Sequence, residues 1–258
     1  MNIPPAPSNL PSQSDAVRVQ VSLRYPIKRP LVTYVILAVT IASFGLQYLS
    51  QTLTGGTDWL YILGGKINEL ILAGQFWRLI TPVLLHASLL HIGFNMYALY
   101  SLGPSLERHY GHGRFFLLYL IAGFSGNALS FIFSPNPSLG ASTAVFGLVA
   151  AEAVFVYKNQ KLFGVRARSI LTNLGVIIVV NLVLGVGSGS GIDNWGHLGG
   201  LAGGLIFAWV AGPIYQVQPG GVTGFELFDS RSKEQVLWGA MLSAGIFLAA
   251  VIGRLLVG

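Results

Sequence analysis

Four polar side chains have the types and spacing needed for acyl transfer: Ser142, His197, His91 and Asn95. A serine hydroxyl becomes a good nucleophile when a neighbouring base accepts its proton, and imidazole has a suitable pKa near neutrality. The tetrahedral intermediate then needs hydrogen-bond donors aimed at its oxyanion. His91 and Asn95 are four residues apart, so both project from one face of a helix, and both can donate. We therefore predict Ser142 as nucleophile, His197 as general base and acid, and His91 and Asn95 as oxyanion stabilisers.

The composition indicates a membrane protein. Of the 258 residues, 53% are apolar and 9% are charged, with a mean hydropathy of +0.65, whereas soluble domains carry about 25% charged residues. This composition argues against a soluble globular domain, a disordered chain and a nucleic-acid-binding module. The chain has no cysteine, which excludes disulfides, thiolate metal sites and a cysteine nucleophile.

Seven apolar stretches approach the roughly 20 residues that a helix needs to cross a bilayer. We expect an all-α polytopic fold with a six-helix core at 31–212 and a seventh transmembrane helix at 236–258. A polar tail (1–30) precedes the core, a cytoplasmic loop (213–235) follows it, and 51–85 forms a segment in the membrane interface, where Trp and Arg anchor well. The seven stretches are 31–50, 86–103, 115–133, 141–157, 168–186, 195–212 and 236–257.

The basic residues predict the orientation. With a cytoplasmic N-terminus, only Lys66, Arg78 and Arg254 lie outside, and the other twelve of the fifteen basic residues lie inside, as the positive-inside rule requires. This orientation places the four site residues, which come from three helices, at a similar shallow depth below the outer surface. Intramembrane polar residues are functional candidates by default. Because no transit peptide precedes the first span, we expect a bacterial plasma membrane.

Small residues predict that two of these helices touch. Gly196, Gly200 and Gly204 recur every fourth residue after the start of the sixth stretch, and Ala144 and Gly147 offer a small surface on the fourth. Such stripes let helices approach closely. A direct hydrogen bond between a serine on one helix and a histidine on the other requires that approach.

These residues, in this order, resemble the rhomboid family of intramembrane serine proteases over about 31–212. Four short patterns carry the resemblance. They are Trp77–Arg78, the array of His86, His91 and Asn95 (HxxxxHxxxN), the GxS of Gly140 and Ser142, and the GHxxG of Gly196, His197 and Gly200.

The resemblance implies a Ser142–His197 dyad, with Phe146 stacked on the histidine, Glu107 as a structural acid and Gly200 as a helix-packing glycine. It further implies cleavage of transmembrane segments of other proteins, without cofactor, ATP, metal or nucleic acid. The partners would be those substrates and the lipid bilayer, and the oligomeric state is left open. The fifth helix and the loop at 186–194 would act as lateral gate and cap. Many family members have glycine directly after the serine, where this chain has Thr143, which bears on the backbone near the oxyanion.

Several alternatives stay open. Asp193, four residues before His197, could complete a triad, although we prefer a dyad. The three histidines could bind a metal, but the sequence has no HExxH motif. His86 could make a structural hydrogen bond or take part directly. Glu152 could be protonated, or paired with Asn127 or Asn181. The whole protein could also be an inactive rhomboid-like binder of client helices, or a solute transporter.

Overall fold

The computed structural model describes residues 23–24, 29–186, 191–220 and 224–257. Within them, each of the seven predicted stretches overlaps one helix of 17 to 25 residues. These helices are α1 (Leu31–Leu53), α4 (Leu89–Tyr110), α5 (His112–Phe133), α6 (Ser142–Lys158), α8 (Arg166–Leu184), α9 (Asn194–Ala211) and α10 (Lys233–Val257).

Four of these helices, α1, α5, α8 and α10, are long and apolar enough to cross a membrane by length and composition. The other three, α4, α6 and α9, hold the candidate site residues and have extensive buried faces. In α6 almost every residue from Thr143 to Val156 is buried. A helix that is apolar all round belongs in the interior of a bundle.

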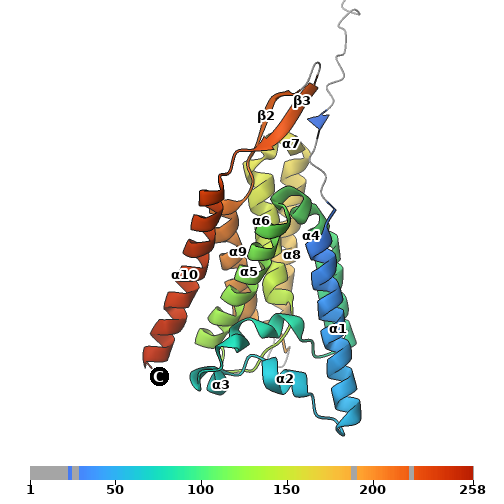
Figure 1. The fold of residues 1–258 in the computed structure, drawn as a ribbon, viewed down its shortest axis with the longest axis vertical. Helices are drawn as coiled ribbons and strands as arrows, with labels where there is room; N and C mark the ends of the chain where they lie inside the picture. The colour runs from blue at the N-terminus through green and yellow to red at the C-terminus, as the bar shows by residue number, and fades with distance from the viewer. Residues whose placement is uncertain (1–22, 25–28, 187–190, 221–223, 258) are drawn as a thin grey trace, which may run out of the picture.

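Helices α5, α6 and α9 pack against one another at the centre of the molecule. Figure 1 shows α1 and α10 on opposite sides of them, with α1 beside α4 and α10 beside α5 and α9. Helix α10 is tied into the bundle, because the Ser243 hydroxyl donates to the Gly203 carbonyl over 2.9 Å and is fully buried. Helix α8 contacts α6 and the short helix α7 (Gln160–Phe163).

The predicted contact between the fourth and sixth stretches is confirmed. A Cβ added at Gly200 of α9 would lie 1.9 Å from the Thr143 carbonyl oxygen of α6. One turn further along, a Cβ at Gly204 would lie 2.4 Å from the Gly147 Cα. The two backbones are therefore in direct contact, and the small-residue stripe is what permits it.

Short helices close one end of the bundle, which we name the site end (Figure 1). Arg78 lies here, and its side chain is 2% exposed. Its guanidinium donates to the carbonyls of Gly65 (2.7 Å) and Ile62 (2.5 Å). We expected Arg78 to be an interfacial anchor, but it braces the chain from within, while Trp77 is half exposed and donates to the Leu63 carbonyl. The short helices are α2 (Trp59–Gly64), α3 (Asn68–Leu72), η2 (Phe76–Leu79) and η3 (Thr81–Leu84).

The all-α prediction is wrong for the segment expected as a plain cytoplasmic loop. Strands β2 (Tyr215–Gly220) and β3 (Gly224–Asp229) form an antiparallel hairpin there, and β1 (Leu23–Arg24) pairs with β3 in parallel, in the order β1-β3-β2. The sequence contains part of the signal, because YQVQ and FEL alternate in polarity on either side of a glycine-rich turn.

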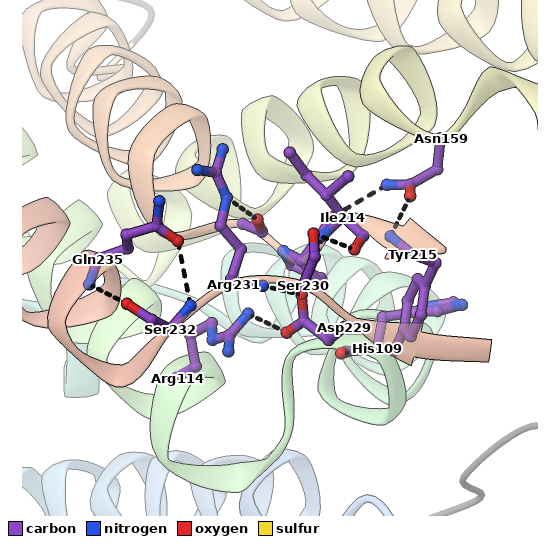
Figure 2. Close-up of polar contacts among 12 residues, drawn as sticks. His109, Arg114, Asn159, Ile214, Tyr215, Asp229, Ser230, Arg231, Ser232 and Gln235 are labelled. Carbon is purple, nitrogen blue, oxygen red and sulfur yellow. Dashed lines mark hydrogen bonds and ion pairs between the residues drawn. The ribbon is translucent and has the colours of Figure 1, made fainter. Parts of the chain in front are cut away.

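Polar contacts fix the hairpin to the helices at the opposite end of the molecule, which we name the hairpin end. Figure 2 shows Asp229 facing Arg114 of α5, with a 2.8 Å ion pair between them. The Asn159 side chain donates to the Pro213 carbonyl and accepts from the Tyr215 N–H. Asn159 directly follows α6, so the helix that begins with Ser142 is held at both ends.

Replacing Gly200 with alanine is expected to destabilise the fold strongly. The added methyl meets backbone rather than a flexible side chain, so α9 must move away from α6, and overpacking costs about 1–3 kcal/mol, occasionally more. Gly45→Ala on α1 is the matched control, since a Cβ there meets nothing within 4 Å. Thermal unfolding in detergent should show a lower Tm for Gly200→Ala and an unchanged or slightly higher Tm for Gly45→Ala. Equal Tm values for Gly200→Ala and the wild type would contradict the close packing.

Candidate active site

Helices α4, α6 and α9 all begin at the site end and bring the predicted residues together. Ser142 is the first residue of α6, His91 lies in the first turn of α4, and His197 lies in the first turn of α9. The backbone N–H groups of a first helical turn have no partner within the helix. The three helices therefore point the positive ends of their dipoles toward one small region.

Gly140 separates His91 from Ser142. Its φ of +133° is a conformation that L side chains rarely adopt. A Cβ at this position would lie 2.7 Å from His91 Nε2 and 3.7 Å from Ser142 Oγ. Glycine is thus required here both for its backbone angle and for space, and the imidazole of His91 lies directly beside the Gly140 turn.

His197 packs flat against Phe146. The ring centroids are 4.1 Å apart and the ring planes differ by 13°. Phe146 lies one turn after Ser142 on α6, and the His197 side chain is buried. The stack places the imidazole along the face of α6 that begins with Ser142.

The direct Ser142–His197 hydrogen bond is not formed in this structure. No hydrogen bond joins their side chains within the described part of the chain, and His197 Nδ1 is buried without a partner there. Catalytic hydrogen bonds are often long before substrate binds. The structure therefore places Ser142 and His197 in the first turns of two adjoining helices without a hydrogen bond between their side chains.

His86 makes structural hydrogen bonds. Its backbone N–H donates to Gln47 Oε1 of α1 (2.9 Å), and its Nε2 accepts from the Ala141 N–H (3.3 Å). Since Nε2 accepts, the hydrogen-bond network assigns the ring proton to Nδ1. The ring also meets His91 edge-on, at 5.0 Å between centroids. His86 thus connects α1 to the residue just before Ser142.

Asn95 is buried and lies one turn below His91 on α4. Its amide donates one hydrogen bond to the His91 carbonyl over 3.0 Å. An amide nitrogen carries two hydrogens, so a second donor remains for another acceptor.

Asp193 caps α9 and does not contact the imidazole. One carboxylate oxygen accepts from the Gly196 N–H (2.9 Å) and the other from the Ser130 hydroxyl (2.5 Å). With both oxygens engaged, the geometry gives no support to a triad. Asp193 is half-buried rather than exposed as the glycine-rich loop suggested. Residues 187–190 of the predicted cap lie outside the described residues.

Two acidic residues in the helices lie away from the site. Glu107 is fully buried near the hairpin end of α4, where it accepts from the backbone N–H groups of Val32 and Thr33 and so caps α1. Glu152 forms neither suggested pair among the described hydrogen bonds: its Oε2 is buried without a partner, while Asn127 donates to the Leu79 carbonyl and Asn181 to the Ile177 carbonyl. No group of three metal-ligating side chains gathers anywhere in the described ranges.

Sequence reasoning missed Lys66 and Gln47. Both are buried, at 0% and 1% exposure. Gln47 donates to Asp58 Oδ2 (2.7 Å) while accepting from the His86 N–H, which links α1, the start of α2 and the backbone before α4. A charged residue inside the apolar segment 51–85 was the available signal for Lys66, and we interpreted it as an interfacial residue.

Comparison with known proteins decides the family. The family model described as "Rhomboid domain" matches residues 73–214, more than half of the chain. The chain belongs to the rhomboid family. It is similar to rhomboid protease GluP of Bacillus subtilis, with 45% identity over 184 residues, which cover 71% of this chain and 35% of GluP. It is also similar to YdcA of the same bacterium, with 32% identity over 186 residues, covering 70% of this chain and 88% of YdcA.

A plant relative shows the same family at greater distance. RHOMBOID-like protein 9 (chloroplastic) of Arabidopsis thaliana is 34% identical over 160 residues, covering 62% of this chain and 37% of its own length. The matched part is thus little more than a third of GluP and of this plant protein. Family membership and apolar helices together establish an integral membrane protein of mostly helical fold.

Replacing Phe146 with leucine is expected to lower kcat while leaving the fold largely intact. Leucine fills much of the space but cannot stack on His197, and such ring contacts contribute about 0.5–1.5 kcal/mol. This corresponds to a loss of about 2- to 13-fold in kcat, measured on a model single-span substrate. Phe155→Leu is the control, because Phe155 is a buried ring on the same helix that packs with His109 at the hairpin end. Equal kcat values per folded molecule for the two variants would contradict the role of the stack.

Proposed function

We propose that this chain is an intramembrane serine endopeptidase that hydrolyses peptide bonds in or near transmembrane segments of other proteins. One observation carries the proposal. Ser142 and His197 lie in the first turns of two helices whose backbones touch at Thr143 and Gly200, and Phe146 stacks on the imidazole from the serine's helix. The proteins similar to this chain include one named a rhomboid protease.

The proposed reaction is acyl transfer by a serine–histidine dyad. His197 accepts the proton of the Ser142 hydroxyl as the oxygen attacks the carbonyl carbon of the scissile bond. His197 then gives this proton to the leaving amine, and the C–N bond breaks. A water molecule, deprotonated by the same imidazole, attacks the acyl-serine, and the proton returns to Ser142 as the acid leaves. Acid–base chemistry of these groups completes the cycle without a cofactor or ATP.

The oxyanion of each tetrahedral intermediate needs donors already in place. We assign His91, Asn95 and the backbone N–H of Ser142 to this role. His91 lies against the Gly140 turn next to Ser142 Oγ, and Asn95 keeps one N–H after bonding to the His91 carbonyl. The dipole of α6 adds a favourable field at its first residue.

The proposed topology has all seven long helices spanning the bilayer. The N-terminus and the hairpin end then face the cytoplasm, and the site end faces outward, as the distribution of basic residues favours. A bacterial plasma membrane is the proposed location, and transmembrane segments of protein substrates are the proposed partners. Helix α8 contacts only α6 and α7 among the described elements with substantial contacts, which suits the proposed role as a lateral gate.

One observation favours a second candidate function. Because the Ser142–His197 hydrogen bond is not formed in the described structure, the chain could instead be a rhomboid-like protein that binds client helices without cleaving them. Such a protein has no need of a nucleophile, and this chain retains both the serine and the histidine. The endopeptidase is therefore the better supported function.

Alanine variants separate the two functions. Ser142→Ala and His197→Ala should each lower cleavage of a model single-span substrate in liposomes by at least about a thousandfold, because they remove the nucleophile and its base. Ser101→Ala is the control, because this exposed α4 hydroxyl bonds only to the Tyr97 carbonyl of its own helix. Both site variants should stay folded and membrane-inserted. Residual cleavage in Ser142→Ala equal to that of the wild type would contradict the proposal.

A further inference from the structure

A buried lysine outside the proposed site holds the loop that leads to the serine. Lys66 lies between α2 and α3 and is fully buried. Its ammonium donates to the carbonyls of Ser134 and Asn136, each over 2.9 Å. Its backbone N–H and carbonyl both pair with Ser138 over 3.0 Å. One residue thus makes four hydrogen bonds to alternate residues of the segment 134–138.

The rest of this loop is held from the same side. The Gly140 N–H donates to the Pro82 carbonyl over 2.9 Å, and the Ala141 N–H donates to His86 Nε2. The loop that runs from the end of α5 to Ser142 is therefore fixed at every second residue and again next to the serine. We name residues 134–141 the serine loop. Its path sets the Gly140 turn, and so the position of Ser142 relative to His91.

The lysine charge is costly at this position. Burial lowers the pKa of Lys66 from its ordinary value to about 8, while the more distant carboxylates of Asp193 and Glu69 act in the opposite direction. Neither of the ion pairs in the described residues includes Lys66. Its acceptors are backbone carbonyls, and Ser134 ends α5, where the helix dipole favours a cation.

An apolar side chain of similar size would avoid this cost, because replacing buried ions by well-packed apolar groups is often neutral or stabilising. The Asn136 carbonyl would then lose the donor that Lys66 supplies, and the Ser134 carbonyl would keep the Asn68 side-chain amide, which donates to it over 2.9 Å. A lysine at this position is thus better explained by the loop conformation that it fixes than by a contribution to the free energy of unfolding.

We propose that Lys66 is a positioning residue for the Ser142 nucleophile: its ammonium fixes the backbone of the serine loop so that Ser142 stays aligned with His197 and His91. This inference rests on the proposed endopeptidase function. It assigns catalytic alignment to a residue that touches neither substrate nor the reacting atoms.

The test compares Lys66→Met with Asn159→Ala. Methionine keeps the volume and loses the donors. Asn159 is the matched control, because it is also buried and also bonds backbone groups, of Phe155, Pro213 and Tyr215. It lies at the other end of α6, about 25 Å from Ser142 at 1.5 Å per residue. Both variants should lower Tm by a similar amount, measured in the same detergent.

Positioning predicts that the kinetics of the two variants differ. Lys66→Met should lower kcat about 10- to 100-fold, because small misplacements of a nucleophile cost this much. Its KM for the model substrate should stay within about threefold of wild type, since the substrate-binding surface is unchanged. Asn159→Ala should keep kcat within about twofold per folded molecule. Lys66→Arg, which keeps the charge and the donors, should recover a large part of the lost kcat.

Two results would overturn the inference. The first is a kcat for Lys66→Met within twofold of wild type. The second is a loss of kcat that is equal in Lys66→Met and Asn159→Ala and that is explained by the unfolded fraction of each variant. If Lys66→Met does not fold, Lys66→Gln gives the same test, because its shorter neutral amide can serve one carbonyl at most and should show an intermediate loss. Wild-type protein that fails to cleave in the same assay would instead contradict the proposed function, whereas active wild type with fully active lysine variants would contradict only the positioning.

Discussion

The approach of α9 to α6 is the constraint on which the rest of the structure depends. Gly200 lies against the Thr143 carbonyl with no room for a methyl group, and Gly204 lies against Gly147 in the same way. In a membrane, helices gain no hydrophobic free energy from associating, so van der Waals contact between backbones must supply the attraction. This contact brings the first turns of both helices together, and these turns carry Ser142 and His197. Thr143 packs into the same interface, because its side chain faces Gly126 and Gly196.

A second layer of polar contacts positions the serine from outside the central helices. Asp58 bonds Gln47, Gln47 bonds the His86 backbone, and His86 bonds the Ala141 N–H, while Lys66 holds the serine loop from the same side. The links through His86 are buried and those at Asp58 and Lys66 are partly buried. Hydrogen-bond networks that are removed from water rigidify a site. The short helices between α1 and α4 thus act as a scaffold for the serine loop.

Periodicity, composition and the spacing of a few polar residues were enough to predict the long helices and one contact between them. Each of the seven stretches overlaps one observed helix, although α4 runs seven residues beyond the predicted end at 103, and the glycine stripe correctly predicted the contact of α6 with α9. The hairpin at Tyr215–Asp229 was not predicted, because its strands are too short to span a membrane and the segment was interpreted as a loop between two membrane helices. Lys66 and Arg78 were misjudged for a different reason. Local sequence shows that a charge lies in an apolar segment, but not that the segment folds over it and offers backbone carbonyls as partners. Such partners come from residues more than ten positions away, and no local pattern contains them.

The measurement that tests the central claim most directly is mass-spectrometric mapping of a serine-directed fluorophosphonate on the protein in native-like membranes. This reagent needs an activated hydroxyl and no knowledge of the natural substrate. The account predicts one adduct, at Ser142, formed in the wild type and lost in His197→Ala. An unmodified Ser142, or an adduct that forms equally fast without His197, would contradict the claim that the contact of α6 with α9 makes this serine a nucleophile.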